Sequence, residues 1–349
     1  MEIIKTVTLP QLDTRLFMPT QVFFEEAALD YPLGRRLQEM FSLRGIPLQM
    51  TPSHNRLNIE GATYAERFHR AKETLVVGVK KDLTLQPCRP SADYRLIENT
   101  SCPGRCHYCY LAASLGERVY MRIYVNIDEI LQSARKKIVS RQPQTTTFEA
   151  SSSSDPVALE HLSGSLRKTI EFFGEQRWGR LRVVTKFANI SSFLDINHQG
   201  NTRFRFSINT DRIIDNYEEH TASLDQRLEG AKLLCQAGYP IGFIIAPLLI
   251  YPHWQEEYSV LLDNVKDTLR EVSREQLTFE LIMHRFTARS ARLIKERFPH
   301  SSLDLSQEGR VHKGFGKYVY EPSKAEELEQ FLRAEINNRF PQGVVEYFT

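Results

Sequence analysis

Apolar positions along this chain follow two rhythms, one typical of strands and one typical of helices. From residue 128 onward, short runs of apolar and β-branched residues alternate with longer segments in which apolar residues recur every three or four positions. Strands are expected at residues 145–150, 181–186, 203–209, 241–246 and 277–283. Helices are expected at residues 128–140, 159–173, 223–237 and 258–272. This succession of strand–helix units predicts an α/β fold whose parallel sheet closes partly into a barrel.

The first 90 residues carry a separate strand–helix–strand pattern. Its expected elements are strands at residues 21–24, 46–50 and 73–80 and a helix at residues 32–44. We interpret residues 1–90 as an N-terminal α/β extension that covers the open side of the barrel in residues 91–300. His54, in a loop of this extension, is interpreted as a hydrogen-bonded structural residue.

Residues 301–349 predict a basic hairpin followed by a closing helix at 325–340 and a last strand at 344–349. The hairpin arms flank a glycine-containing turn, and cationic and aromatic side chains interleave along them. Such a stretch can contact phosphates and wedge beside a base, so Lys313, Lys317 and Tyr318 are candidate DNA contacts. A solvated hairpin with ordinary surface charges is the alternative.

Composition adds constraints on location and on partners. The chain has 349 residues and a net charge of +2, so any basic surface that binds nucleic acid must be local. No secretory signal and no apolar run of membrane-spanning length occurs. Five cysteines, mostly clustered, favour a reducing compartment. We therefore expect a cytoplasmic protein that does not bind membranes.

Three of the five cysteines, Cys102, Cys106 and Cys109, lie within eight residues in the spacing C-x3-C-x2-C. Three converging thiolates suit a [4Fe–4S] cluster that keeps one iron open for a small molecule. A structural zinc site normally needs a fourth ligand, and His107 lies directly beside Cys106, where it would struggle to reach the same ion. A disulfide with a spare thiol would suit a secreted protein. We therefore predict an open iron–sulfur cluster.

At this motif the chain resembles the radical S-adenosylmethionine (SAM) superfamily, and further segments resemble the spore photoproduct lyases. The segments that carry the resemblance are residues 53–55, 74–79, 106–111, 124–126, 148–150, 203–209, 278–282 and 316–320. The resemblance implies a partial (βα)6 barrel, bound SAM, and a C-terminal β-hairpin. It also implies UV-damaged DNA as substrate, a reductant such as ferredoxin or flavodoxin, and a monomer.

By the same resemblance, Ser154, Lys186, Ser207 and Ala246 stand where the family contacts SAM. Lys186 also follows a buried apolar run, where a cation can hold the methionyl carboxylate. The Gly-Gly-Glu motif common in the superfamily is absent, and the serine run ending at Asp155 occupies its place. We expect the serines and Asp155 to substitute for it.

The family's reaction, as the resemblance implies it, starts from a 5′-deoxyadenosyl radical that removes a hydrogen from C6 of 5-thyminyl-5,6-dihydrothymine. The methylene bridge then breaks, and the remaining thymine radical needs a hydrogen atom. A lesion within a duplex must also be flipped outward to reach the site, which a basic hairpin would assist.

The chain departs from the family at the hydrogen donor. Known members carry a cysteine at the position of Ser152, and a serine O–H bond is too strong to replace a thiol S–H bond. Of the two thiols outside the motif, Cys235 falls at an apolar position of an expected helix, which indicates packing. Cys88 lies between two prolines in a stiff loop and is our candidate donor, although a buried apolar role is the alternative. Tyr108 and Tyr110 are expected to return the hole to the cofactor.

Two other functions stay open. A homologue without the usual cysteine could bind damaged DNA, or cleave SAM, without completing repair. The chain could also be a radical enzyme that acts on an unrelated base. A thiol close to the radical site separates these possibilities from repair.

Overall fold

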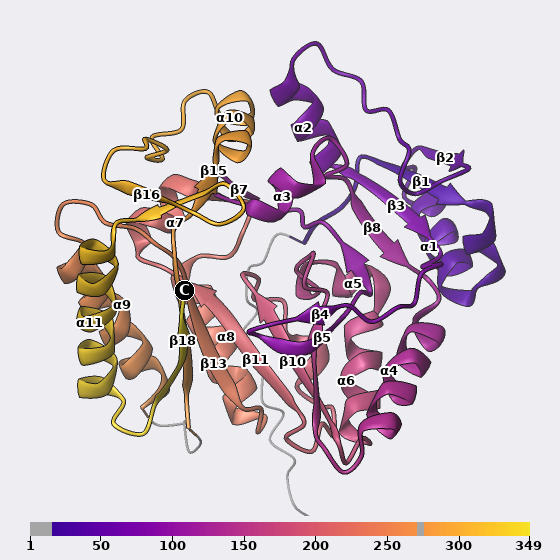
Figure 1. The fold of residues 1–349 in the computed structure, drawn as a ribbon. Helices are drawn as coiled ribbons and strands as arrows, with labels where there is room; N and C mark the ends of the chain where they lie inside the picture. The colour runs from indigo at the N-terminus through magenta and orange to yellow at the C-terminus, as the bar shows by residue number, and fades with distance from the viewer. Residues whose placement is uncertain (1–15, 271–275) are drawn as a thin grey trace, which may run out of the picture.

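The computed structural model describes residues 16–270 and 276–349, and its centre is one curled, mostly parallel sheet (Figure 1). The spatial order is β18-β14-β13-β11-β10-β9-β5-β4. The strands are β4 Pro87–Cys88, β5 Ala92–Leu96, β9 Thr146–Ala150, β10 Gly179–Thr185, β11 Thr202–Ile208, β13 Ile241–Leu248, β14 Thr278–Met283 and β18 Val344–Phe348. Only β4 runs antiparallel to its neighbour. The expected α/β class is confirmed, and the curl fits a partial barrel.

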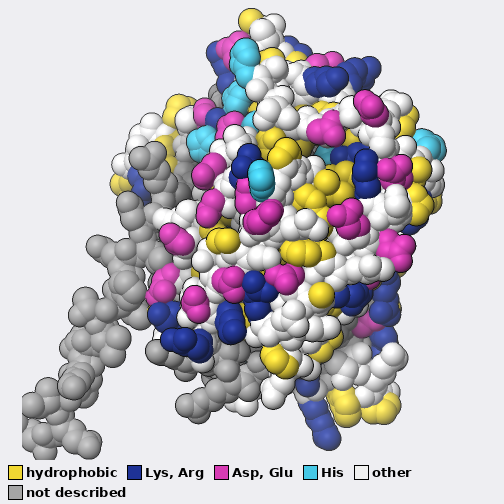
Figure 2. Space-filling view, turned by 90° about the vertical axis from the view of Figure 1, so that its left-hand side faces the viewer, with side chains coloured by type: hydrophobic (Ala, Val, Ile, Leu, Met, Phe, Trp, Pro, Cys, Tyr) yellow, Lys and Arg dark blue, Asp and Glu magenta, His cyan; other side chains and the backbone are white. Residues whose placement is uncertain are grey.

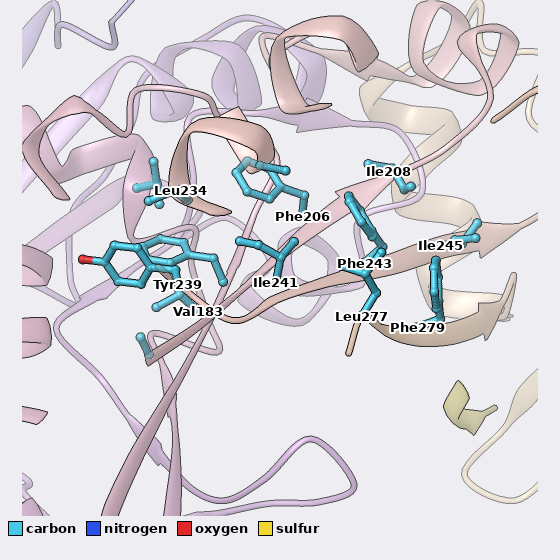
Figure 3. Close-up of a cluster of buried hydrophobic side chains, with 14 of the residues drawn as sticks. Val183, Phe206, Ile208, Leu234, Tyr239, Ile241, Phe243, Ile245, Leu277 and Phe279 are labelled. Atoms are coloured by element: carbon cyan, nitrogen blue, oxygen red, sulfur yellow. The ribbon is translucent and has the colours of Figure 1, made fainter. Parts of the chain in front are cut away.

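Helices cover the outer face of the curl (Figure 1). They are α4 Ile127–Arg141, α6 Ser165–Gly174, α8 Leu224–Gln236, α9 Trp254–Leu269 and α11 Pro322–Arg339. Between helices and sheet lies the main apolar core, in which alternate residues of a strand point the same way, as Ile241, Phe243 and Ile245 of β13 do in Figure 3. This period of two is what a strand with one face against helices requires.

One expected helix is wrong. Residues 159–173 divide into α5 Glu160–Ser163 and α6, because Gly164 between them adopts φ +66°. Glycine tolerates this left-handed conformation, which ends one helix and lets the next start in a new direction. The expected helix 258–272 begins earlier, at Trp254, and its last two expected residues lie outside the described part of the chain.

A second sheet of five strands packs beside the first, in the order β2-β1-β3-β8-β6. Its elements are β1 Gln21–Glu25, α1 Pro32–Leu43, β2 Leu48–Thr51, α2 Tyr64–Lys72, β3 Thr74–Gly78, β6 Asn99–Thr100 and β8 Met121–Tyr124. Strands β6 and β8 pair with each other and flank the three-cysteine segment in sequence. His54 lies in this region with Nδ1 2.9 Å from Oε1 of Glu25, which confirms its structural role.

The C-terminal region carries a small three-stranded sheet. It consists of β15 Phe286–Thr287, β16 Arg310–Lys313 and β17 Lys317–Tyr320, with α10 Ala288–Arg297 beside it. β16 and β17 pair antiparallel, and Phe315 at their turn is 97% exposed with φ +63°. Figure 2 shows basic and acidic side chains interleaved on the side of the molecule that carries α9 and α11. In the described residues, no helix is both long and apolar enough to span a membrane.

Glu98, just after β5, is a buried carboxyl without a clear partner. Neither side-chain oxygen has a hydrogen bond of normal geometry within the described structure, although the hydroxyl of Thr169 lies close by, and burial raises the pKa of Glu98 to about 7. A raised folded-state pKa contributes stability that is complete below the usual pKa of the carboxyl and is lost as the pH rises through about 7. The protein is therefore expected to lose stability between pH 5 and pH 8.

Glu98→Gln is expected to remove most of that loss. At about 1.4 kcal/mol for each pKa unit, the variant should be more stable than the parent chain by roughly 3 kcal/mol at pH 8 and by less than about 1 kcal/mol at pH 5. Thermal and urea unfolding at both pH values measure this difference. Glu308→Gln, at an exposed carboxyl, is the matched control. An equal effect of Glu98→Gln at both pH values would contradict the burial argument.

Candidate active site

The three-cysteine loop is fixed on both sides by backbone and side-chain hydrogen bonds. Strand β7 Arg105–Cys106 pairs antiparallel with β12 Glu218–Glu219, which follows helix α7 Asp211–Tyr217. Cys109 caps helix α3 Tyr110–Leu115, and its Sγ accepts the amide of Ala112 at 3.4 Å. The amide of Gly104 donates to Sγ of Cys102 at 3.3 Å. Hydrogen bonds from backbone amides stabilise the thiolate form of cysteine, and the thiolate is the form that binds a metal cation.

The thiols themselves fit an iron–sulfur cluster. A charge on Cys109 acts on both Cys102 and Cys106, so the three thiols lie near one another. Burial raises the pKa of Cys102 to about 12 and that of Cys106 higher still, which only a bound cation would offset. Within residues 16–270 and 276–349, no group of three or more His, Cys, Asp or Glu side chains is arranged so that it could hold a single metal ion. A cubane, which places each thiolate on a different iron, does not require that arrangement.

His107 does not serve as a fourth ligand. Its Nδ1 lies 2.8 Å from Oγ of Ser301 and its Nε2 lies 3.0 Å from Oε1 of Glu219. The ring also stacks on Phe298 with a centroid separation of 4.1 Å. Because both ring nitrogens have other partners, His107 joins the cysteine loop to the C-terminal region. The zinc alternative therefore lacks its fourth ligand.

The four positions expected to contact SAM meet at one edge of the main sheet. Ser154, Lys186, Ser207 and Ala246 lie at or just beyond the carboxyl ends of β9, β10, β11 and β13, which are successive neighbours. Ser154 also forms an isolated bridge with Ser101, directly before the cysteine loop. The carboxyl edge of the strands and the cysteine loop are thus adjacent, as chemistry at the strand ends of a barrel requires.

Lys186 lies in a small buried charge cluster at this edge. Its Nζ is 2.8 Å from Oε1 of Glu218 and 3.1 Å from the hydroxyl of Tyr108, which donates to the same carboxylate. Arg227, fully buried, donates to Oε2 of Glu218 at 2.5 Å. Burial opposes ionisation of Glu218, but the charges of Lys186 and Arg227 prevail and lower its pKa to about 2. Glu218 therefore holds Tyr108 and Lys186 together.

Asp155 is hydrogen-bonded to the end of β10, at the strand edge. Its two oxygens accept the hydroxyl of Thr185 at 2.9 Å and the amide of Lys186 at 2.8 Å, and burial raises its pKa to about 6. Within the serine run, the Ser154 hydroxyl donates to the carbonyl of Ser101, and Ser151 accepts two amides after β5. These side chains order the backbone around the cysteine loop. That the serines and Asp155 substitute for the missing cofactor-binding motif stays a prediction.

Cys88 and Ser152 are neighbours. Cys88 lies on β4, and the side chain of Ser152 is within hydrogen-bonding reach of its thiol. Burial, followed by the charge of Glu149, raises the pKa of Cys88, so the sulfur keeps its hydrogen at neutral pH. The phenol of Tyr110 is close enough for a charge on Cys88 to act on it. By contrast, Cys235 packs against the main core.

The hairpin that carries Cys88 is anchored from inside the barrel. Ser91, at its turn, donates to Glu149 at 2.5 Å and accepts from Arg205 at 2.9 Å, while Arg182 donates to the Ser91 carbonyl at 2.7 Å. Arg205, 1% exposed, is itself paired with Glu149 and with Glu280. A rigid ionic network therefore sets the position of the thiol.

Sequence reasoning missed Glu218, Arg227 and Ser91. Ser91 and Glu218 belong to no motif, and Arg227 lies within an otherwise ordinary helix. The network beneath Ser91 did leave a trace in the sequence, because Arg182, Arg205 and Glu280 are charged residues that each stand directly between two apolar residues of a strand. Charges in such strands need partners across the sheet, but the sequence does not say which.

The profile of the family described as "Spore photoproduct lyase" matches residues 17–349. This chain belongs to the spore photoproduct lyase family. The match includes the cysteine loop, the strand edge and the Cys88 hairpin, so the whole site described above lies within it.

Curated spore photoproduct lyases resemble the chain over almost its full length. The protein of Bacillus subtilis (strain 168) is 44% identical over 338 residues, which is 95% of this chain and 99% of that protein. The protein of Geobacillus sp. (strain Y412MC61) is 45% identical over the same length and coverage. Identity at this level over whole chains makes this family member a lyase by descent.

Solved structures of spore photoproduct lyase share the fold. One, complexed with dinucleoside spore photoproduct, has a TM-score of 0.94 and 44% identity, and covers 96% of this chain and 100% of its own. Another has bound AdoMet and the dinucleoside, with the same TM-score and coverage and 45% identity. In that double variant one cysteine is replaced by alanine and one serine by cysteine.

Proposed function

We propose that this chain is a DNA-repair lyase that reverts spore photoproduct to two thymines. The observation that carries the proposal is the three-cysteine loop, set against the carboxyl edge of the sheet in a chain whose relatives bind AdoMet and the lesion. The residues expected to hold the cofactors are Cys102, Cys106 and Cys109 for a [4Fe–4S] cluster, and Ser154, Lys186, Ser207 and Ala246 for SAM. When bound, the two cofactors together supply a 5′-deoxyadenosyl radical.

The chain's own residues position the reaction and exclude water from it. Lys186 faces the strand edge with an ammonium that can exchange its contact with Glu218 for the methionyl carboxylate. Buried strand ends and the cysteine loop enclose the site, which protects a radical from solvent. Loss of a hydrogen atom from C6 of the lesion, followed by breakage of the methylene bridge, leaves one thymine and one thymine radical.

In this proposal Cys88 gives its thiol hydrogen to that radical. The resulting thiyl would regain a hydrogen atom relayed by Tyr110 and Tyr108, on either side of Cys109, and the methyl group of 5′-deoxyadenosine would be the source of that atom. Support comes from the contact between Cys88 and Ser152, the position at which known members carry the donor cysteine. In the double variant that binds AdoMet and the dinucleoside, the two substituted positions have the same sequence separation as Cys88 and Ser152. The natural sequence of this chain would therefore carry its thiol at the same one of the two positions as that double variant does.

The regions of the chain would divide the work. Residues 91–300 would hold the cofactors, residues 1–90 would cover the barrel, and the 301–349 region would contact DNA through Lys313, Lys317 and Tyr318. The exposed turn between β16 and β17 would then help to extrude the lesion from the duplex. We also propose a monomer in the cytoplasm, reduced by a ferredoxin or flavodoxin.

Lys313→Gln with Lys317→Gln is expected to weaken binding to damaged duplex DNA. Each phosphate that the protein no longer neutralises should reduce the slope of log K against log salt by about 0.9, so the double change should lower it by nearly 2. Fluorescence anisotropy between low and moderate salt measures the slope. Lys168→Gln, an exposed lysine on α6, is the control. An unchanged slope would remove the hairpin from the interface.

Product analysis under strictly anaerobic conditions tests the whole proposal. Reconstituted protein is incubated with SAM, a reductant and spore-photoproduct dinucleotide, and the products are followed by mass spectrometry. Restored thymidine dinucleotide is expected. Formation of 5′-deoxyadenosine with an intact lesion would instead support the second candidate, a homologue that cleaves SAM without completing repair. A serine at position 152, where the resemblance puts the family's donor cysteine, favours that candidate.

A further inference from the structure

Lys72, the last residue of α2, is a buried cation. It is 3% exposed, and it is the only lysine in the described residues that falls in the buried class. Its Nζ donates to the carbonyl of Cys102 at 2.6 Å and lies 5.7 Å from the centre of the Phe68 ring. Its stem and its charge are therefore both withdrawn from water, directly beside the first residue of the cysteine loop.

No carboxylate in the described part of the chain forms an ion pair with Lys72. The adjacent carboxylate, Glu73, pairs with Arg105 instead, at 2.8 Å. A carbonyl and an aromatic face offset only part of the cost of burying an ammonium, which usually needs a full opposite charge. Its Nζ instead contacts the backbone of Cys102, the first of the three cysteines in the loop. The three thiols are therefore the groups from which its counter-charge can come.

A cluster held by three thiolates carries net negative charge and becomes more negative by one unit on reduction. Net charge and nearby charged or hydrogen-bonding groups are among the features that set the potential of such clusters. A fixed cation in a site of low dielectric constant favours the more negative state. We propose that Lys72 is the counter-charge of the cluster. In this role it raises the reduction potential of the cluster, so that a cellular reductant can transfer an electron to it.

This inference rests on the iron–sulfur cluster of the proposed function, but not on the identity of the lesion. The test uses full-length Lys72→Met, which keeps an unbranched side chain and removes the charge. Arg70→Gln removes a cation from the same helix at a solvent-exposed position and is the matched control. Each protein is reconstituted anaerobically, its iron content is measured, and its midpoint potential is determined by redox titration with electron paramagnetic resonance.

The midpoint potential of Lys72→Met is expected to be lower than that of the parent chain, while Arg70→Gln leaves it unchanged. Equal potentials at equal iron content would overturn the inference. A parent chain that takes up no iron would instead overturn the proposed function, and the two failures are thus distinguishable.

A second measurement, thermal unfolding, applies if the variant takes up little iron. Without the cluster, the buried ammonium of Lys72 has no carboxylate partner in the described part of the chain, so apo Lys72→Met is expected to unfold at a temperature equal to or above that of the apo parent. Reconstitution should also stabilise the variant less than it stabilises the parent. If apo Lys72→Met is instead less stable or fails to fold, Lys72 serves packing and the inference is overturned.

Discussion

Cys88→Ala is expected to keep SAM cleavage and to lose clean repair. The thymine radical left after the methylene bridge breaks would find no S–H bond, and the hydroxyl of Ser152 beside it holds its hydrogen too strongly. The yield of thymine pairs per 5′-deoxyadenosine should fall more than tenfold, with by-products of the trapped radical in their place. Mass spectrometry of products formed in D2O adds a second readout, because an exchangeable thiol places deuterium in the repaired thymine and the variant should not.

Two further variants make this test specific. Cys235→Ala removes the other thiol outside the cysteine loop, which packs against the core, and should leave the product ratio unchanged. Cys88→Ala combined with Ser152→Cys moves the thiol across the contact between the two residues and should restore repair. Clean repair by Cys88→Ala alone would exclude Cys88 as the donor.

Glu218→Ala is expected to destabilise the protein by about 3 to 5 kcal/mol, the usual cost of removing one partner of a buried ion pair. Arg227 is fully buried and would keep an uncompensated charge, while Tyr108 and Lys186 would lose the group that orients them. Urea unfolding of the apo protein measures the loss. Because Lys186 would also lose its ion pair with Glu218, the affinity of the cluster-containing protein for SAM should change as well. This affinity is measured independently of the unfolding free energy.

An exposed ion pair provides the comparison. Asp195, 71% exposed, pairs with Arg167 at 2.7 Å, and Asp195→Ala should cost much less stability than Glu218→Ala. Combining Glu218→Ala with Arg227→Met removes both buried charges and should recover part of the stability, which a double-mutant cycle would quantify. A loss from Glu218→Ala no larger than that from Asp195→Ala would show that the cluster is not energetically coupled.

The sequence predicted the features that depend on short-range pattern. The cysteine spacing, the strand runs and the positions of Lys186 and Ser207 at strand ends are all local, and the strand–helix succession implied the parallel sheet. Gly164 was equally local, but its left-handed conformation became visible only in the structure. Helical periodicity continued across it, so the pattern alone did not show the break.

Features that depend on pairing across the fold could not be predicted. Lys72 ends an amphipathic helix with other basic residues, which indicates a solvated lysine, and only the position of α2 against the cysteine loop buries it. Glu218 acquires its role because β12 pairs with β7 across more than a hundred residues. A strand of two residues carries no periodicity, so nothing in the sequence marks that partnership.

The pairing of β6 with β8 has a consequence for how the protein is made. The cysteine loop is the chain that joins these two strands, and β8 also pairs with β3 of the N-terminal sheet. During synthesis the N-terminal sheet therefore cannot acquire its fourth and fifth strands until residue 124 has left the ribosome, and by then all three cysteines have emerged. Strand β12, which pairs with the cysteine loop, is translated later, so the loop reaches its final arrangement only after residue 219 has been made.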